Sequence, residues 1–218
     1  MNQTGFKVKG IFLDLDGTIV DSTDAYMEAA RIAFHNIGLE SPGKKIALEI
    51  PKRLEQGFSL TDLTNGETKK FLSVYFKTYY AVSQQKTKLI PNVSTALEAL
   101  SHKAKIALIT MRYASKQTVI KELECFGISQ YFTHVVTAQD TLKPKPSPEA
   151  LMNCVKALDL EICDCVIAGD SVIDIRAGKA AGAKTVALLS GLFQCGELVK
   201  ESPDLILNDL TALPPFIE

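Results

Sequence analysis

The sequence has no tryptophan, only three histidines and an odd number of cysteines, five in 218 residues. The histidines lie far apart, and the one close cysteine pair, Cys163 and Cys165, is spaced Cys-x-Cys. This pattern excludes the usual spacing of a zinc site and does not provide a disulfide framework. We interpret the cysteines as reduced residues that pack as small hydrophobic side chains.

An excess of charge and long apolar runs are absent as well. The 24 basic and 25 acidic residues nearly balance, and no basic run suggests a nucleic-acid partner. Every apolar stretch ends well before the roughly 18–20 residues that a membrane span needs. Residues 1–9 lack the apolar segment of a secretory signal. We therefore expect a cytoplasmic protein with neither a nucleic-acid nor a membrane partner, and the sequence does not specify its oligomeric state.

What the sequence does contain is a regular alternation of hydrophobic runs and amphipathic segments. The runs predicted to be strands are 8–13, 106–109, 134–137, 165–168, 185–189 and 204–207. Helical spacing of apolar residues appears between them, at 93–102, 116–126 and 147–158. This order is typical of an α/β fold, a Rossmann-like doubly wound parallel sheet with helices on both faces.

Residues 21–88 interrupt the alternation. They contain no convincing strand, and their pattern predicts three or four helices, among them 22–37, 44–54 and 67–85. We expect an α/β core domain of residues 1–20 and 89–218, with a small helical domain of residues 21–88 inserted after the first strand. Ligands of open parallel sheets bind beyond the carboxyl ends of the strands, where such an insert would stand. A subdomain that serves packing alone is the alternative.

Two pairs of acidic residues follow predicted strands. Asp14 and Asp16 end the first strand, and Asp170 follows a later strand with Asp174 one helical turn beyond it. Carboxylates crowded at the end of a buried strand are unfavourable without a cation or a proton. Neighbouring parallel strands would bring three or four of them together. The sequence thus predicts a site for an oxygen-preferring divalent cation, for which Mg²⁺ is best suited.

Groups that could hold an anion opposite these acids are also present. Thr110 ends the strand 106–109, where its hydroxyl and the following backbone N–H groups can face a phosphate. Lys143 and Lys145 alternate with Pro144 and Pro146. The Lys-Pro-x-Pro spacing favours Lys143 as the residue that supports the phosphate, because the prolines stiffen the backbone that aims it.

In this order, the four segments resemble the four motifs of the haloacid dehalogenase-like superfamily. They are Asp14-Leu15-Asp16-Gly17-Thr18, Thr110, Lys143-Pro144-Lys145-Pro146 and Gly169-Asp170-Ser171-Val172-Ile173-Asp174. The insert resembles the helical cap of the subgroup that contains phosphoglycolate phosphatase and β-phosphoglucomutase. The likeness covers nearly the whole chain, and it implies the same core-and-cap fold.

The resemblance also implies roles for the acids. Asp14 would be the nucleophile that forms an aspartyl-phosphate. Asp16 would protonate the leaving oxygen and then activate water, while its backbone carbonyl binds Mg²⁺. Asp14 and Asp170 would complete the metal site, and Asp174 would hold a metal-bound water or Lys143.

The same resemblance assigns the binding of the phosphoryl oxygens to Thr110, Lys143 and the two residues after Thr110, which are Met111 and Arg112. Many relatives have asparagine at the position of Met111. Arg112 would either add a charge near the substrate or lie in solvent. In the insert, Arg53 stands in the region where a β-phosphoglucomutase relative would have an Arg-Ser-type segment.

These features predict a magnesium-dependent phosphohydrolase that cleaves a small phosphorylated metabolite, similar to phosphoglycolate phosphatase. Asp16 opposes a dehalogenase, because cleavage of a carbon–halogen bond needs no protonated leaving group. The alternative enzyme is a phosphosugar mutase of the β-phosphoglucomutase type. A binding protein without turnover is opposed by the full set of reactive residues, and a dinucleotide-binding protein by the lack of a glycine-rich turn after the first strand.

Overall fold

A computed structural model of the protein describes residues 5–218. Residues 1–4 lie outside the described residues, and with them the start of the predicted core domain and of the segment judged not to be a signal. The chain divides into two compact units. One comprises Met1–Val20 and Leu89–Glu218, and the other comprises Asp21–Lys88.

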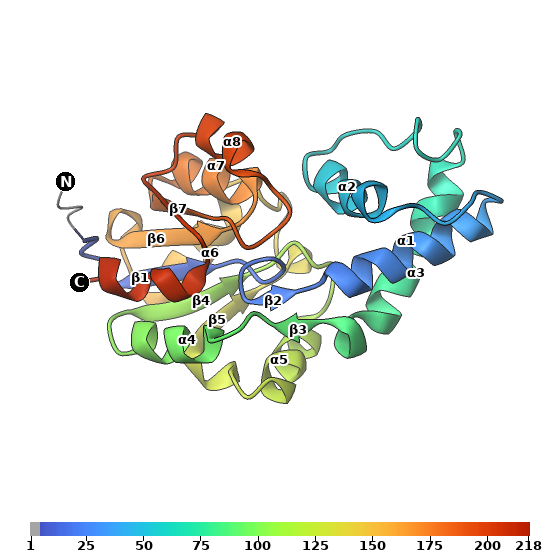
Figure 1. Ribbon diagram of the computed structural model, residues 1–218. Helices are drawn as coiled ribbons and strands as arrows, with labels where there is room; N and C mark the ends of the chain where they lie inside the picture. The colour runs from blue at the N-terminus through green and yellow to red at the C-terminus, as the bar shows by residue number, and fades with distance from the viewer. Residues whose placement is uncertain (1–4) are drawn as a thin grey trace. The chain divides into compact units, whose positions relative to one another are not determined.

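The first unit is built on a six-stranded parallel sheet (Figure 1). Its strands are β1 (Gly10–Leu13), β4 (Lys105–Ile109), β5 (Phe132–Val136), β6 (Cys165–Gly169), β7 (Lys184–Leu188) and β8 (Leu205–Leu207). Their order across the sheet is β5-β4-β1-β6-β7-β8, and every neighbouring pair is parallel. The predicted Rossmann-like α/β fold is confirmed.

Helices cover both faces of this sheet. They are α4 (Val93–Ser101), α5 (Lys116–Cys125), α6 (Glu149–Leu158), α7 (Val172–Ala181) and α8 (Cys195–Lys200). Single 3₁₀ turns lie at Ser129–Tyr131, Ala138–Asp140, Ile162–Asp164, Leu210–Ala212 and Pro214–Phe216. Side chains alternate along β1, so that Ile11 joins a core with Leu97 of α4, whereas Phe12 joins another core with Leu151 of α6. The continuous apolar runs of the sequence reflect this burial on both faces.

The second unit is helical, as predicted. It consists of α1 (Thr23–Asn36), α2 (Lys44–Glu55) and α3 (Thr68–Lys86). Four buried alanines form one face of α1, and aromatic side chains of α3, including Phe71 and Tyr75, share their core. The sequence did not predict two short paired strands, β2 (Val20–Asp21) and β3 (Lys88–Leu89), where the chain passes between the units.

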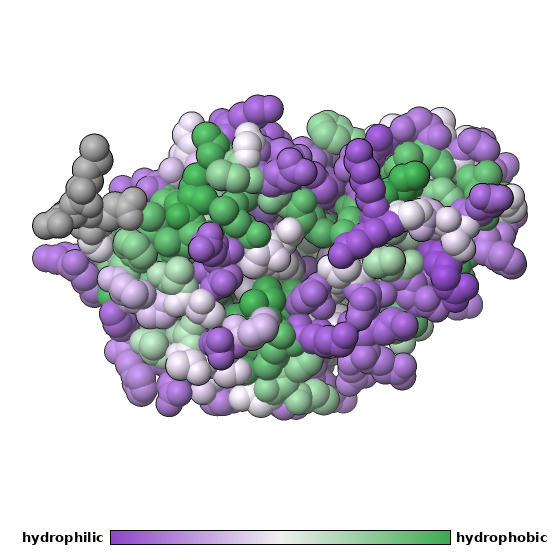
Figure 2. Space-filling view, in the orientation of Figure 1, coloured by the Kyte–Doolittle hydropathy of each residue, from purple (hydrophilic) through white to green (hydrophobic). Residues whose placement is uncertain are grey.

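In one view, hydrophilic residues cover much of the surface and hydrophobic residues gather in patches between them (Figure 2). Exposed apolar side chains are normal in folded proteins. Among the described residues, no helix is both long and apolar enough to cross a membrane.

Candidate active site

The residues of the predicted motifs meet at the carboxyl ends of three adjacent strands. β1 lies between β4 and β6 in the sheet. The residue that follows each of these strands is Asp14 after β1, Thr110 after β4 and Asp170 after β6. Because the strands are parallel, these residues emerge at the same edge of the sheet, where ligands of such folds bind. The topology thus joins segments that are far apart in the sequence.

A buried acidic cluster forms at this edge. Asp14, Asp170 and Asp174 each offer a carboxylate oxygen, and these oxygens lie within 4.8 Å of one another. Burial raises the pKa of Asp14 to about 7, an increase that the Lys145 ammonium opposes and the charge of Asp174 reinforces. Three carboxylates so close together disfavour ionisation unless a cation neutralises them. A donor set made only of oxygens fits Mg²⁺.

Asp174 owes its position to the start of α7. The Ser171 backbone N–H donates to Asp174 Oδ2 at 3.1 Å, and Ser171 Oγ accepts from the Ile173 N–H. This reciprocal capping satisfies amide groups of the first turn and holds the carboxylate there. The second oxygen, Oδ1, bonds Lys145. The helix begins at Val172, directly after Ser171.

Asp170 is held by two loops. Thr18 Oγ1 donates to its Oδ1 at 3.3 Å, and the Leu192 backbone N–H donates to its Oδ2 at 3.1 Å. Glycines allow both approaches: a Cβ at Gly17 would lie 2.5 Å from Oδ2, and a Cβ at Gly191 only 1.7 Å from it. The segment around Gly191 was not foreseen as part of the site. Its only local signal is a glycine shortly after a predicted strand.

Lys145, rather than Lys143, lies against the acidic cluster. Its ammonium donates to Asp14 Oδ1 at 2.7 Å, to Asp174 Oδ1 at 2.6 Å and to the Ile109 carbonyl oxygen at 3.1 Å. Burial acts to lower the pKa of Lys145, but the charges of the two aspartates outweigh it and raise the pKa above its ordinary value. Lys145 is therefore a buried cation that offsets part of the cluster's negative charge.

The prediction that Lys143 occupies this place is wrong. The Lys143 side chain is exposed, and its backbone N–H donates to Glu149 Oε2 at 3.0 Å. Glu149 also accepts from the Leu142 N–H, so this carboxylate fixes the start of the loop on the surface. Each of the two lysines precedes a proline that restricts its backbone. The Lys-Pro-x-Pro spacing does not discriminate between them, because Lys145-Pro146-Ser147-Pro148 has the same spacing as Lys143-Pro144-Lys145-Pro146.

The fourth acid, Asp16, turns its carboxylate toward Arg112. Arg112 Nε donates to Asp16 Oδ2 at 2.8 Å, and Nη2 donates to Oδ1 at 2.7 Å. The third nitrogen, Nη1, donates to Glu122 Oε2 on α5. Only 5% of the Arg112 side chain is exposed. The alternative that Arg112 is a solvated residue is therefore wrong. The expectation was that Arg112 binds phosphate directly, but Nε, Nη1 and Nη2 already donate to two carboxylates, and a phosphate would have to compete with these bonds.

Thr110 and Met111 remain at the same strand end. The Thr110 backbone N–H continues the ladder to the Val136 carbonyl oxygen at 3.0 Å, and its hydroxyl accepts from the Arg112 N–H at 3.1 Å. Met111 packs its side chain against the apolar cluster of α7 that includes Ile173. Any contact of Met111 with a phosphate would therefore come from its backbone.

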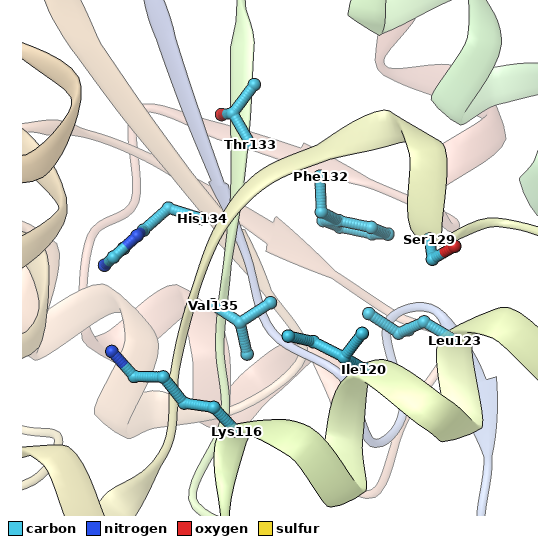
Figure 3. Close-up of a pocket in the computed structure, with 8 residues that line it drawn as sticks. All are labelled: Lys116, Ile120, Leu123, Ser129, Phe132, Thr133, His134 and Val135. Carbon is cyan, nitrogen blue, oxygen red and sulfur yellow. The ribbon is translucent and has the colours of Figure 1, made fainter.

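A separate groove lies at the edge of the sheet, between α5 and β5 (Figure 3). Figure 3 shows Ile120 and Val135 lining it, with Lys116 and His134 on one side of Val135. Its volume of about 220 Å³ is smaller than the roughly 300–1,000 Å³ of typical ligand pockets. None of the acids described above lines it. We do not assign the chemistry to this groove.

In the second unit, Arg53 has carboxylate partners of its own. Its Nε donates to Glu49 at 3.1 Å, and its Nη1 donates to Asp62 at 2.7 Å. The bond to Glu49 lies within α2, and the bond to Asp62 links α2 to the segment that follows it. Both bonds occupy donors that a substrate anion would otherwise use.

Known proteins share this arrangement of sequence and fold. A phosphoglycolate phosphatase of Pseudomonas fluorescens is 28% identical over 94% of this chain and 78% of its own length. A protein of Clostridium perfringens provisionally named a pyrophosphatase is 26% identical over 97% of this chain and 98% of its own. The crystal structure of a predicted phosphoglycolate phosphatase from Haemophilus somnus superposes with a TM-score of 0.74 at 25% identity, covering 96% of this chain and 97% of that one.

A structural relative from Streptococcus pneumoniae, a haloacid dehalogenase-like hydrolase, has a TM-score of 0.82 at 21% identity and covers 94% of this chain and 95% of its own. That likeness shows the shared fold. The family model of haloacid dehalogenase-like hydrolases matches residues 11–188, a span that runs from β1 to the end of β7 and contains all four predicted motifs. The chain therefore belongs to the haloacid dehalogenase-like hydrolases.

Proposed function

We propose that this protein is a magnesium-dependent phosphatase that cleaves a small phosphate monoester through a phosphorylated Asp14. The observation that carries the proposal is the position of Asp14. It is buried at a strand end, bonded to the Lys145 ammonium, and within 4.8 Å of the carboxylate oxygens of Asp170 and Asp174. A reactive carboxylate in such a setting is suited to covalent catalysis.

In the first half of the reaction, a carboxylate oxygen of Asp14 attacks phosphorus. A P–O bond to Asp14 forms, the P–O bond to the leaving group breaks, and Asp16 donates a proton to the departing oxygen. Lys145 and the Thr110 strand end face the phosphoryl group. They offset charge that is spread over its oxygens in the transition state.

In the second half, water replaces the leaving group. Asp16, now a carboxylate, accepts a proton from the water as its oxygen attacks phosphorus. The bond between phosphorus and Asp14 breaks, and inorganic phosphate and the free Asp14 carboxylate result. The net reaction of the two halves is the hydrolysis of one ester bond by one water molecule, after which Asp14 and Asp16 are back in their starting protonation states.

The acidic residues fit a magnesium ion. Asp14 and Asp170 would hold it, with Asp174 beside them, because oxygen donors of this number leave room for waters and a phosphate oxygen. When bound, Mg²⁺ supplies positive charge that allows an anionic substrate to approach the carboxylates. The donor groups that hold Asp170 in place, from Thr18 and Leu192, keep that carboxylate at the same edge as Asp14.

For the substrate, phosphoglycolate is the first candidate. The relatives named phosphoglycolate phosphatase support it, since they match 94–96% of this chain at 28% identity. A pyrophosphate substrate is the natural comparison, because a relative of similar identity carries that name. Both are small anions in which oxygen links phosphorus to the leaving group, and the mechanism above applies to each.

The test is phosphate release from a panel that includes phosphoglycolate, pyrophosphate, phosphosugars and p-nitrophenyl phosphate, with and without Mg²⁺. Asp14→Asn is the control, because it keeps the size of the side chain and removes the nucleophile. We expect release only with a divalent cation and only from the wild type. Absence of release from every compound with every divalent cation would refute the proposal. Isomerisation of a phosphosugar without free phosphate would identify a mutase instead.

A further inference from the structure

A second buried ionic cluster lies beside the acidic cluster. It consists of Asp16, Arg112 and Glu122, which belong to three different segments of the first unit. Asp16 follows β1, Arg112 follows β4, and Glu122 lies on α5. The Arg112 guanidinium bridges the two carboxylates, with both oxygens of Asp16 on one side and Oε2 of Glu122 on the other.

All three side chains are largely withdrawn from water. The exposed fractions are 5% for Arg112, 8% for Glu122 and 12% for Asp16. Burial raises the pKa of Glu122, although the charge of Arg112 opposes this. Buried charges are tolerated when they are paired with good geometry, and a two-pronged arginine–carboxylate pair fixes the plane of the carboxylate as well as its distance. Surface pairs of the same type lack this constraint.

The rest of Arg112 is also fixed. Its backbone N–H donates to the Thr110 hydroxyl at 3.1 Å, and its carbonyl oxygen accepts from the Ala138 N–H at 3.2 Å. These bonds fix the Arg112 backbone, while burial and the two ion pairs hold its side chain. Its fork is aimed at Asp16 from a main chain that is tied to β4 and to the turn after β5.

We propose that Arg112 is a positioning residue for Asp16, and that Glu122 anchors Arg112. This inference rests on the proposed function, in which Asp16 transfers the protons. The fork matches the carboxylate form of Asp16, which accepts the proton of water; to protonate the leaving oxygen, Asp16 first takes up a proton at one oxygen, which weakens the Arg112 bond to that oxygen. The strand end that presents Thr110 to the phosphate thereby also orients the proton-transfer group. Arg112 acts on the reaction through Asp16 and does not bind the substrate itself.

The proposal predicts that Arg112→Lys and Asp16→Asn damage the same step. Lysine keeps the charge but loses the planar fork, so it cannot hold both oxygens of Asp16. General acid–base catalysis contributes roughly 10²–10⁴-fold to rates, and a misplaced Asp16 should forfeit part of it. We expect Arg112→Lys to lower kcat about 10- to 100-fold on an alkyl phosphate, with KM changed less than about threefold.

The decisive measurement is a double-mutant cycle on two esters. Wild type, Arg112→Lys, Asp16→Asn and the double variant are assayed with an alkyl phosphate and with p-nitrophenyl phosphate, whose leaving group needs little protonation. The double variant should be no more than about twofold slower than Asp16→Asn, because the arginine has nothing left to position. Both single variants should lose less on p-nitrophenyl phosphate than on the alkyl ester.

Two further variants keep the test sound. Arg176→Lys is the matched control, because Arg176 makes the same two-pronged contact with Glu201 on the surface, at 3.0 and 2.6 Å. It should change kcat less than about twofold. If Arg112→Lys does not fold, Glu122→Gln replaces it in the cycle. Glutamine keeps the acceptor for Nη1, so Glu122→Gln should lower kcat less than Arg112→Lys does. In a protein that already carries Asp16→Asn, Glu122→Gln should not lower kcat further.

Other outcomes would overturn the proposal. Losses that multiply in the double variant would show that Arg112 acts independently of Asp16, and a raised KM with unchanged kcat would make Arg112 a substrate-binding residue. If the wild type hydrolyses no ester, the proposed function fails, and thermal unfolding of the same four proteins still tests the pair. Additive losses of melting temperature would then refute the coupling of Asp16 and Arg112.

Discussion

Replacing Lys145 with methionine tests the charge balance of the site. The Lys145 ammonium has three N–H donors, and all three are used, by Asp14, Asp174 and the Ile109 carbonyl oxygen. Only 2% of its side chain is exposed. Methionine has a similar volume and fills the space, but it leaves two buried carboxylates without their common cation.

The expected loss follows from that geometry. Removing one partner of a buried ion pair costs about 3–5 kcal/mol, because the remaining charge stays buried and unpaired. Burial already raises the pKa of Asp14 to about 7. Asp14 can therefore take up a proton in the variant, which limits the loss to the lower end, about 3 kcal/mol at neutral pH. Catalysis should suffer more, with kcat falling about 10²–10³-fold, as for the loss of one electrostatic contact to a transition state.

Lys143→Met is the matched control, because it makes the same substitution two residues earlier on an exposed side chain. It should change the free energy of unfolding by less than about 0.5 kcal/mol and leave the rate of hydrolysis nearly unchanged. Urea unfolding gives the stabilities, and p-nitrophenyl phosphate hydrolysis gives the rates. The reasoning is refuted if the Lys143 variant loses activity while the Lys145 variant keeps it, or if the Lys145 variant is as stable as wild type.

Three further predictions follow from the packing. Gly191→Ala places a methyl group 1.7 Å from Asp170 Oδ2, so it should lower the free energy of unfolding by about 1–3 kcal/mol and remove most of the phosphatase activity. The control is Gly196→Ala, whose methyl group meets no atom within 4 Å and should be neutral or stabilising. Equal effects of the two variants on unfolding and activity would contradict this. Burial raises the pKa of the Cys154 thiol to about 12. A thiol reagent should therefore modify the three exposed cysteines of the native protein and spare Cys154. Rapid labelling of Cys154, detected by mass spectrometry, would disprove its burial. Burial acts to raise the pKa of Asp204, but the hydrogen bonds from the Thr185 N–H and hydroxyl, together with the charge of Lys184, outweigh burial and lower the pKa. The stabilisation is therefore complete above the ordinary pKa of an aspartate and is lost as the pH falls through the lowered pKa. Asp204→Asn should cost about 1 kcal/mol at neutral pH and less near about pH 3, and an equal cost in urea titrations at the two pH values would contradict this.

The strand ends could be predicted because the local signal is strong. A buried parallel strand is a continuous apolar run, and the first polar residue after it marks the carboxyl edge of the sheet. Asp14, Thr110 and Asp170 all occupy that position. No pairing information was needed to expect them at one edge, since parallel strands share it.

The lysine and the arginine could not be placed in the same way. Which of two lysines turns inward depends on the path of the loop, and that path is set by Glu149, a residue that accepts two backbone hydrogen bonds from the loop. Arg112 can be buried because its guanidinium pairs with the carboxylate of Asp16, which lies 96 residues earlier in the sequence. Such long-range pairs have no local signature in a single sequence.

One signal for the arginine cluster was nevertheless present. On the predicted helix at 116–126, Glu122 lies three residues after Val119 and directly before Leu123, both of which are buried. An acid on the apolar face of a helix requires a buried partner. Arg112, on the segment that leads into this helix, is a nearby cation. The pattern would have indicated that Arg112 turns inward.

The two buried clusters differ in what they need. Arg112 donates three short bonds to Asp16 and Glu122, so this cluster sets one guanidinium against two carboxylates, and Glu122 Oε1 is buried without a hydrogen-bond partner. The other cluster sets three carboxylates against one ammonium. When all three are ionised, two negative charges remain unbalanced in a buried place, a state that a divalent cation relieves and a phosphate alone would worsen. A cation bound there would stabilise the folded chain by mass action, so added Mg²⁺ should raise its melting temperature, and Asp170→Asn should diminish that rise.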